Sequence, residues 1–271
     1  MYTIDELQQI ATKVRRGILE QVYTAKSGHP GGALSCADIL TAIYFNLANI
    51  DPKNPTKEDR DRVILSKGHA SAALYSVLAH RGFFDVEELK TFRKLHSGLQ
   101  GHPSLGKLSG VDMTSGSLGQ GLSVANGMAL AAKIDNKRYY TYVILGDGEI
   151  EEGQVWEAAM SSAHYKLNNL IVFVDNNGLQ IDGKVTEVNS PTPIKEKFDA
   201  FGFNTIEIDG HNFDEIQNAV QKAKESIDKP TAIIAKTVKG KGVSFMENQV
   251  GWHGKAPNEE QYNLALDELN K

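Results

Sequence analysis

The chain has 271 residues, of which 41% are hydrophobic, and it carries a formal net charge of −5. That length allows a substantial core in one large or two small domains, and the scattered basic residues argue against a nucleic-acid partner or an anionic membrane surface. A single cysteine, Cys36, excludes an internal disulfide framework, so we expect a cytoplasmic protein in which this thiol is a small buried side chain.

The first half of the chain is predicted to begin with an amphipathic helix. Apolar residues recur at helical spacing from Ile4 to Val22, and Thr3 is placed to cap that helix. Because the segment is charged throughout, it is neither a signal peptide nor a membrane span. The elements predicted to follow are a helix after Ser35 through residue 48, a polar loop at 51–61, a strand at 62–66, a helix at 70–81 ended by Gly82, an irregular segment at 94–117 and a helix of small residues at 119–132.

Strands alternate with helices in the second half of the chain. This alternation predicts a doubly wound α/β fold, a mostly parallel sheet with helices on both faces, and we expect one domain over residues 1–271. Ligands of such sheets bind beyond the carboxyl ends of the strands. The predicted strands are 139–145, 169–175, 205–209 and 231–238, and the predicted helices are 151–165, 193–201 and 213–227.

An acidic turn follows the strand at 139–145, in the stretch GDGEIEEGQVWEAA that begins at Gly146. Its glycines free the backbone to turn sharply, and a helix begins a few residues later with its positive end towards the same place. Asp147 alone would repel a phosphate, but Mg²⁺ between Asp147 and a diphosphate removes that conflict. The next strand ends in DNNGLQIDG, where the amide oxygen of Asn177 and a main-chain carbonyl can complete the site. On its own, GDG equally describes a capped helix with a solvated acidic first turn.

The joint pattern is more specific, because one strand ends in GDG and the next ends in DNN, with Asn177 thirty residues after Asp147. This pattern resembles the metal and diphosphate motif of thiamine-diphosphate enzymes. Nine stretches in all are similar to the amino-terminal half of transketolase, and they occur in the order of that family. They are SGHPGG (27–32), SKGHAS (66–71), GHPS (101–104), TSGSLGQGLSVANGMA (114–129), GDGEIEEGQVWEAA, VDNNGLQIDG (174–183), DGHN (209–212), KTVKGKG (236–242) and GWHG (251–254).

The resemblance implies a site for thiamine diphosphate and a divalent metal, Mg²⁺ or Ca²⁺. Each residue to which the resemblance assigns a role lies in one of the nine matching stretches. The implied metal ligands are Asp147, Asn177 and the main-chain oxygen of Leu179, the implied diphosphate contacts are Gly148, His69 and His253, and the segment implied to lie along the aminopyrimidine contains Gly116 and Leu118.

The resemblance also implies catalytic and interface residues. His29 and His102 match histidines that face the substrate hydroxyls near the reacting carbon, where an imidazole can donate to a developing alkoxide. Glu152 and Glu157 match acids at a subunit interface that link two active sites through hydrogen bonds, and Glu152 is counted with the cofactor-binding residues.

The remaining charged residues of these motifs are expected to have ordinary roles. The role of His211 stays open: it is either a functional residue or one that only shapes a turn. We expect the following residues to be structural or solvated: Glu149 and Glu151 in an acidic first turn, Lys236, Lys239 and Lys241 in a basic turn, and His80, His96 and His164.

The chain matches only one half of the resembled family, whose usual members are more than twice as long. Their second domain supplies the glutamate that protonates the aminopyrimidine and most contacts to the sugar phosphate, and nothing here resembles it. The resemblance therefore implies the diphosphate-binding subunit of a split transketolase, active only with a separate carboxy-terminal subunit in an assembly of two copies of each. The implied reaction transfers a two-carbon ketol unit from a ketose phosphate to an aldose phosphate.

Four alternatives stay open at this point. Three are enzymes: a half-subunit similar to 1-deoxyxylulose-5-phosphate synthase, the α subunit of a 2-oxo acid dehydrogenase, and a split transketolase dedicated to an unusual sugar. The paired GHP motifs and TSGSLGQG favour transketolase over the first two. The fourth is a non-catalytic regulatory or scaffolding subunit that kept the fold, which the retained histidines and Asp147 disfavour.

Overall fold

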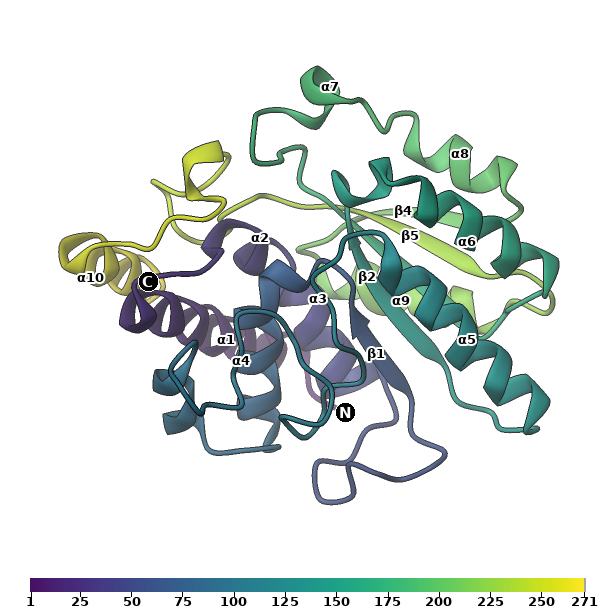
Figure 1. Cartoon of the computed structure of the whole chain (residues 1–271), viewed down its shortest axis with the longest axis horizontal. Helices are drawn as coiled ribbons and strands as arrows, with labels where there is room; N and C mark the ends of the chain where they lie inside the picture. Colours follow the sequence, from purple (N-terminus) through teal and green to yellow (C-terminus); the bar gives the residue numbers. More distant parts are fainter. Residues whose placement is uncertain (271) are drawn as a thin grey trace.

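A five-stranded parallel sheet forms the centre of the molecule (Figure 1). The computed structural model describes residues 1–270. Every pair of neighbouring strands is parallel, in the order β1-β2-β3-β5-β4. The strands are β1 (Arg62–Leu65), β2 (Thr141–Gly146), β3 (Leu170–Asn176), β4 (Asn204–Asp209) and β5 (Thr231–Lys236).

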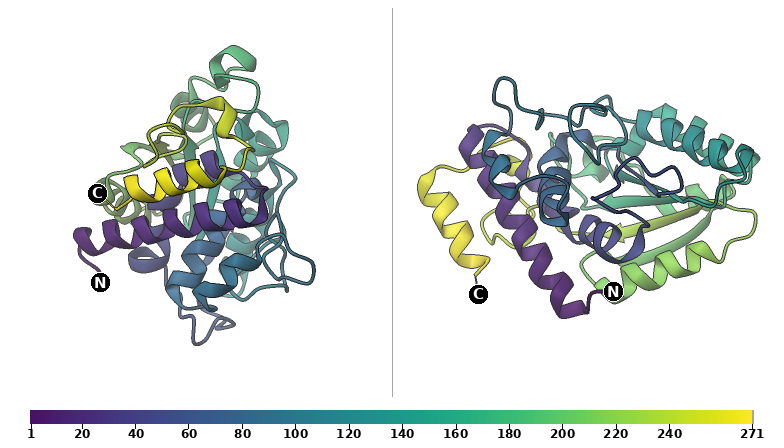
Figure 2. Two further views of the ribbon diagram at one scale, coloured as in Figure 1. Left: turned by 90° about the vertical axis from the view of Figure 1, so that its left-hand side faces the viewer. Right: turned by 90° about the horizontal axis from the view of Figure 1, so that it is seen from below.

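Helices cover both faces of the sheet (Figure 2), which confirms the predicted doubly wound α/β fold. One face carries α1–α4 and α9, and the other carries α5, α6 and α8. The helices are α1 (Ile4–Ala25), α2 (Pro30–Ser35), α3 (Ala37–Ala42), α4 (Ser71–Arg81), α5 (Gln120–Ile134), α6 (Gly153–His164), α7 (Val185–Val188), α8 (Ile194–Ala200), α9 (Phe213–Lys224) and α10 (Glu259–Glu268).

The sheet separates two hydrophobic cores. Successive side chains of a strand point to opposite faces, so in β2 Tyr142 and Ile144 enter the core under α1–α4, whereas Val143 and Leu145 enter the core under α5 and α6. All residues of β2 are buried, as expected for a central parallel strand. Burial of each large apolar side chain contributes about 1.5–3 kcal/mol, so the central strands are held firmly in place.

The helix ends follow the capping signals in the sequence. Thr3 accepts the Glu6 N–H at 3.3 Å, and the Glu6 carboxylate accepts the Thr3 N–H at 2.7 Å, a capping box that starts α1 as predicted. Gly82 ends α4 in the left-handed region at φ 96°, also as predicted. α10 lies beside α1 (Figure 2), where Tyr262 stacks on Tyr23 with ring centroids 4.2 Å apart.

The helical region around Ser35 differs from the prediction. A helix was expected only after Ser35, but α2 already begins at Pro30, because proline suits the first position of a helix. The predicted helix at 151–165 begins at Gly153, after a 3₁₀ turn over Glu149–Glu151. The short α7 was not predicted. Among residues 1–270, no helix combines the length and the apolar character that crossing a bilayer requires.

Strand register brings the two predicted motifs together. Gly146 at the end of β2 pairs with Asp175 near the end of β3, and the Asp147 N–H donates to the Asp175 carbonyl at 3.3 Å. The residues that follow both strands therefore lie at one edge of the sheet.

Candidate active site

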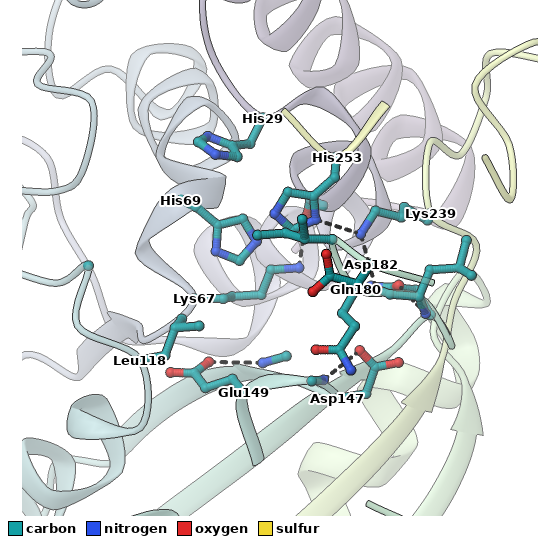
Figure 3. Close-up of a pocket in the computed structure, with 17 residues that line it drawn as sticks. His29, Lys67, His69, Leu118, Asp147, Glu149, Gln180, Asp182, Lys239 and His253 are labelled. Atoms are coloured by element: carbon teal, nitrogen blue, oxygen red, sulfur yellow. Dashed lines mark hydrogen bonds between the residues drawn. The ribbon is translucent and has the colours of Figure 1, made fainter. Parts of the chain in front are cut away.

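A cavity of about 250 Å³ lies beyond the carboxyl ends of β1, β2 and β3 (Figure 3). It stands where ligands of parallel α/β sheets usually bind. All predicted site residues line it except His102 and Glu152. Those that line it are His29, His69, Gly116, Leu118, Asp147, Gly148, Asn177, Leu179 and His253.

The three predicted metal ligands meet at the bottom of this cavity. The side chain of Asp147 is 2% exposed, and its carboxylate accepts the N–H of Gly148 at 2.9 Å and the N–H of Gly178. The Asn177 amide oxygen accepts the Leu179 N–H at 3.1 Å. Burial, and secondarily the neighbouring Asp175 carboxylate, raise the pKa of Asp147 to about 6. A nearby cation would therefore stabilise the ionised form of Asp147.

The donor set limits which metal fits here. Within residues 1–270, no three or more His, Cys, Asp or Glu side chains gather in a way that could hold a metal. A metal at this place would be held by one carboxylate, one amide oxygen and one main-chain oxygen. Such an all-oxygen set suits hard cations such as Mg²⁺ and Ca²⁺ rather than zinc or copper.

A buried ion pair between Lys67 and Asp175 supports the site from below. The Lys67 ammonium also donates to the Gly32 carbonyl at 2.9 Å, while Asp175 accepts from Ser35 at 2.6 Å and from the Thr237 hydroxyl. Although burial opposes ionisation, Lys67 holds the pKa of Asp175 below its usual value. Buried charges are stable only when they are satisfied in this way. The motif SKGHAS contains Lys67, but its sequence does not reveal the partner.

Glu149 corrects the prediction of a solvated acidic turn. Its side chain is 3% exposed and accepts three hydrogen bonds: the Gly119 and Gly146 N–H groups each donate at 3.0 Å, and the Ser66 hydroxyl is the third donor. Burial raises the pKa of Glu149, and the three donors oppose that effect. The 3₁₀ turn before α6 points this side chain inward, which an acidic first turn of a regular helix would not do.

Lys239 corrects the prediction of a solvated basic turn. Its side chain is 2% exposed, and its ammonium lies 3.0 Å from both the Leu179 carbonyl and His253 Nδ1. Burial, followed by the charge of Lys67, lowers the pKa of Lys239 to about 8. Lys236 is exposed, in agreement with the prediction. Lys67, Asp147, Glu149, Asp175 and Lys239 are called the charged floor below.

Histidines gather on the side of the cavity away from Asp147 and Glu149 (Figure 3). The ring centroids of His29, His69 and His253 lie 5.1–5.5 Å apart, and His102 lies 6.4 Å from His29. Burial is the main cause that lowers the pKa of His29 to about 4 and of His253 to about 3, and it also lowers the pKa values of His69 and His102. Each ring is therefore neutral near pH 7, with one donor and one acceptor nitrogen. These four residues are called the histidine rim below.

The histidine rim rests closely on glycines. Gly116 has φ +141°, and a Cβ there would lie 3.2 Å from the His102 ring. A Cβ on Gly32 would lie 3.3 Å from His69 Nε2. His29 Nδ1 is buried without a hydrogen-bond partner among the described residues. These glycines let backbone and imidazole approach each other at the mouth of the cavity.

The predicted interface acids lie outside the cavity. Glu152 and Glu157 are exposed at and near the start of α6. On the outer surface of α5 and α6, Val124 and Met160 are also exposed, Met160 at 62%. These two side chains lie on helices that pack against each other, and contiguous exposed apolar surface is typical of interaction sites.

The other residues singled out in the sequence do not line the cavity. His211 lies between Asp38, whose carboxylate is 2.7 Å from Nδ1, and the Val238 N–H, which donates to Nε2 at 2.9 Å. His211 thus orders the turn after β5. Cys36 is fully buried, as expected of a small core side chain. His80, His96 and His164 also lie outside the cavity.

A cavity at the carboxyl edge of a parallel sheet, lined by Asp147, Asn177 and several histidines, can hold an anionic cofactor together with a cation. Residues 7–269 match the family described as transketolase, thiamine diphosphate binding domain, and the chain belongs to that family. The resemblance inferred from the nine motifs is thereby confirmed.

Relatives of two lengths match this chain. It is 46% identical over 266 residues to the 6-deoxy-6-sulfo-D-fructose transketolase subunit SqwG of Clostridium sp. (strain MSTE9), covering 98% of this chain and 97% of that protein. It is 41% identical over 268 residues to one of the subunits of the apulose-4-phosphate transketolase of Phocaeicola vulgatus, covering 99% and 95%. The crystal structure of transketolase from Campylobacter jejuni superimposes with a TM-score of 0.93 at 39% identity, covering 99% of this chain but 43% of that one.

Proposed function

We propose that this chain is the diphosphate-binding subunit of a two-subunit transketolase, a single domain that acts with a separate carboxy-terminal subunit. The two relatives named as transketolase subunits match along nearly their whole length. The chain spans about 40% of the human transketolase that it also matches. One observation carries the proposal. Asp147 and Asn177, at neighbouring strand ends, share one cavity with His29, His69 and His253.

Thiamine diphosphate and a divalent cation fit the charged floor. Asp147, Asn177 and the Leu179 carbonyl are the proposed ligands of Mg²⁺ or Ca²⁺, because they bring oxygen atoms to the end of two adjacent strands. The raised pKa of Asp147 supports this assignment, since a buried carboxylate gains from a cation. The Leu179 carbonyl accepts from Lys239 at 3.0 Å, and the second lone pair of that oxygen is the one proposed to face the metal.

The diphosphate is proposed to lie between the metal ligands and the histidine rim. His69 and His253 can donate to phosphate oxygens. The Gly148 N–H, which donates to Asp147 in the structure without ligands, is proposed to turn to the diphosphate once a metal engages that carboxylate. Lys239 joins this set, because its ammonium is inside the cavity and beside His253. Gly116 and Leu118 line the neighbouring wall, where they are proposed to contact the aminopyrimidine.

His29 and His102 are proposed to handle the substrate hydroxyls. When bound, thiamine diphosphate supplies the electron sink that lets a carbon–carbon bond beside a carbonyl be broken and remade. The protein must orient the ketose phosphate and move protons at its hydroxyls. A neutral His29 or His102 can accept the proton of the donor hydroxyl that becomes the carbonyl of the released aldose. It can then give that proton to the acceptor carbonyl oxygen, which becomes a hydroxyl of the product ketose. The buried Nδ1 of His29 leaves one ring nitrogen for such a contact.

The partner subunit is proposed to bind over the outer surface of α5 and α6. Glu152 and Glu157 lie there together with exposed apolar side chains. A second copy of this chain and two partner subunits would form an assembly of two of each. In that arrangement the partners supply the aminopyrimidine glutamate and the sugar-phosphate contacts.

The substrate is proposed to be a ketose phosphate or a chemically similar anionic ketose. The names of the two subunit relatives specify 6-deoxy-6-sulfo-D-fructose and apulose 4-phosphate. An unusual sugar therefore stays a candidate for the physiological substrate. The donor distinguishes transketolase, which takes its two-carbon unit from a ketose, from an enzyme similar to 1-deoxyxylulose-5-phosphate synthase or to a 2-oxo acid dehydrogenase, which use 2-oxo acids.

Reconstitution tests the proposal. The chain would be purified alone and together with the product of the neighbouring open reading frame, each with Mg²⁺ and thiamine diphosphate. We expect ketol transfer only from the pair, assayed with xylulose 5-phosphate, fructose 6-phosphate, 6-deoxy-6-sulfofructose and pyruvate as donors. Full ketol transfer by the chain alone would refute the requirement for a second subunit. Use of pyruvate in place of every ketose would refute the transketolase assignment.

A further inference from the structure

Glu149 is a buried carboxylate of the cavity wall for which the proposed reaction has no use. Three segments that are far from one another in the sequence donate to it. They are the residue after β1, Ser66, the last residue of β2, Gly146, and the residue before α5, Gly119. Burying a carboxylate costs free energy, which its hydrogen bonds must offset. The presence of a buried acid at position 149 therefore calls for an explanation.

The two backbone donors belong to the two sides of the cofactor site. Gly119 directly follows Leu118, which lines the wall assigned to the aminopyrimidine. Gly146 directly precedes Asp147, the assigned metal ligand. A single side chain therefore joins the loop 116–119 to the turn 146–148. Gly119 is also the N-cap of α5, so the negative charge lies favourably at the positive end of that helix.

We propose that Glu149 is a positioning residue that holds the loop 116–119 against the turn 146–148 and so fixes the distance between the two halves of the cofactor site. This inference rests on the proposed function for the identity of those halves. A binding site must hold its contacts within a fraction of an ångström, and a rigid buried bridge provides that precision.

The bridge requires a carboxylate rather than an amide. The two oxygens of Glu149 accept from three donors, with Gly119 and Ser66 at one oxygen and Gly146 at the other. Glutamine has nearly the same volume but only one acceptor oxygen. In either orientation of its amide, one NH₂ hydrogen faces the N–H of Gly119 or of Gly146. The Ser66 hydroxyl can rotate to accept, whereas a backbone N–H cannot.

The experiment compares Glu149→Gln with two control variants. Ser66→Ala removes one hydrogen bond to the same carboxylate but leaves both backbone contacts. Glu151→Gln changes a partly exposed acid two residues away that bonds to Gln180. Amide hydrogen exchange of the purified chain, resolved by NMR, reports on Gly119 and Gly146 directly. We expect exchange at one of these two amides to accelerate about tenfold to hundredfold in Glu149→Gln, the loss expected for one hydrogen bond to a charged group, and to stay unchanged in both controls.

A kinetic measurement on the reconstituted enzyme separates positioning from general stability. In Glu149→Gln the KM for thiamine diphosphate should rise about tenfold or more, while the KM for the ketose donor stays within about twofold. Ser66→Ala should leave both KM values unchanged even where it lowers the melting temperature. Should Glu149→Gln not fold, Glu149→Asp keeps the charge on a shorter side chain and is expected to change the same two readouts in the same direction.

Two results would overturn the inference. One is unchanged exchange at both Gly119 and Gly146 in Glu149→Gln. The other is an increase in the cofactor KM that Ser66→Ala reproduces. Absence of ketol transfer from the wild-type pair would instead refute the proposed function, and the exchange measurement on the chain alone would still decide whether Glu149 forms the bridge.

Discussion

The charged floor and the histidine rim belong to one site, and all their members except Asp175 and His102 line the cavity, yet they differ in how completely this chain satisfies their side chains. In the floor, Glu149 accepts three hydrogen bonds, and Lys67 and Asp175 form a buried pair with further partners. In the rim, His29 Nδ1 has no partner among the described residues, and His102 lies on an exposed part of its loop.

This difference indicates that the two groups of residues have different functions. Floor residues stand at strand ends or on turns locked by internal hydrogen bonds, so they suit a ligand that stays bound. In the rim, His29 and His102 keep ring nitrogens available, so they suit a ligand that is exchanged in every turnover. The floor, together with His69 and His253, should therefore control cofactor affinity, and His29 and His102 should control turnover.

The largest effect is expected from breaking the floor at its metal ligand. Asp147→Ala removes the one carboxylate of the proposed metal site and leaves a diphosphate without its cation. We expect metal-dependent binding of thiamine diphosphate to become undetectable, a loss of at least about a hundredfold, as measured by calorimetry with and without Mg²⁺. Unchanged cofactor affinity in this variant would show that the metal is held elsewhere.

A smaller effect is expected from breaking the rim. His102→Ala removes an imidazole that is proposed to exchange protons with the donor hydroxyls, and general acid–base groups of this kind contribute about 10²–10⁴-fold. In the reconstituted enzyme kcat should fall by about a hundredfold, while the Kd of thiamine diphosphate changes by less than about threefold. A parallel loss of cofactor affinity would contradict the division between floor and rim. His96→Ala, an exposed histidine outside the cavity, is the matched control.

The smallest effect is a dependence of cofactor affinity on pH. The pKa of Asp147 is raised to about 6 in the protein without ligands, and a bound cation requires the ionised carboxylate. Affinity should therefore be full above about pH 6 and fall by up to about tenfold for each unit below it, because a proton then competes with the cation. Calorimetry at pH 7.5, 6.5 and 5.5 measures the slope. Binding of Mg²⁺ to thiamine diphosphate in buffer alone, at the same pH values, serves as the reference for protonation of the cofactor itself.

The sequence was sufficient to predict that Asp147 and Asn177 lie together at one edge of the sheet. GDG and DNN each follow an apolar strand, and parallel strands that are neighbours end at the same edge of the sheet. The observed pairing of Gly146 with Asp175 satisfies that condition. The helix boundaries that carried clear caps, such as Thr3 and Gly82, were also predicted correctly.

The charged residues of the floor could not be assigned from local sequence. Glu149 was expected to be solvated because an acid early in a helix usually faces water, but a 3₁₀ turn directs it inward. Lys239 was expected in a solvated turn because two other lysines surround it in KTVKGKG, and those letters do not tell which lysine turns inward. The partner of Lys67 lies 108 residues away, a distance that no local pattern covers.

The pairing of β2 with β3 has a consequence for insertions and deletions. Asp147 and Asn177 lie together because Gly146 pairs with Asp175, and side chains alternate between the two faces of a strand. A one-residue deletion inside β3 would shift that register, turn Asn177 away from the cavity and exchange the two cores along the whole strand. A one-residue insertion in the turn at 166–169, before β3 begins, leaves the register intact. Length variation in this protein should therefore be tolerated at the amino end of the sheet and excluded from the strands that lead to the cavity.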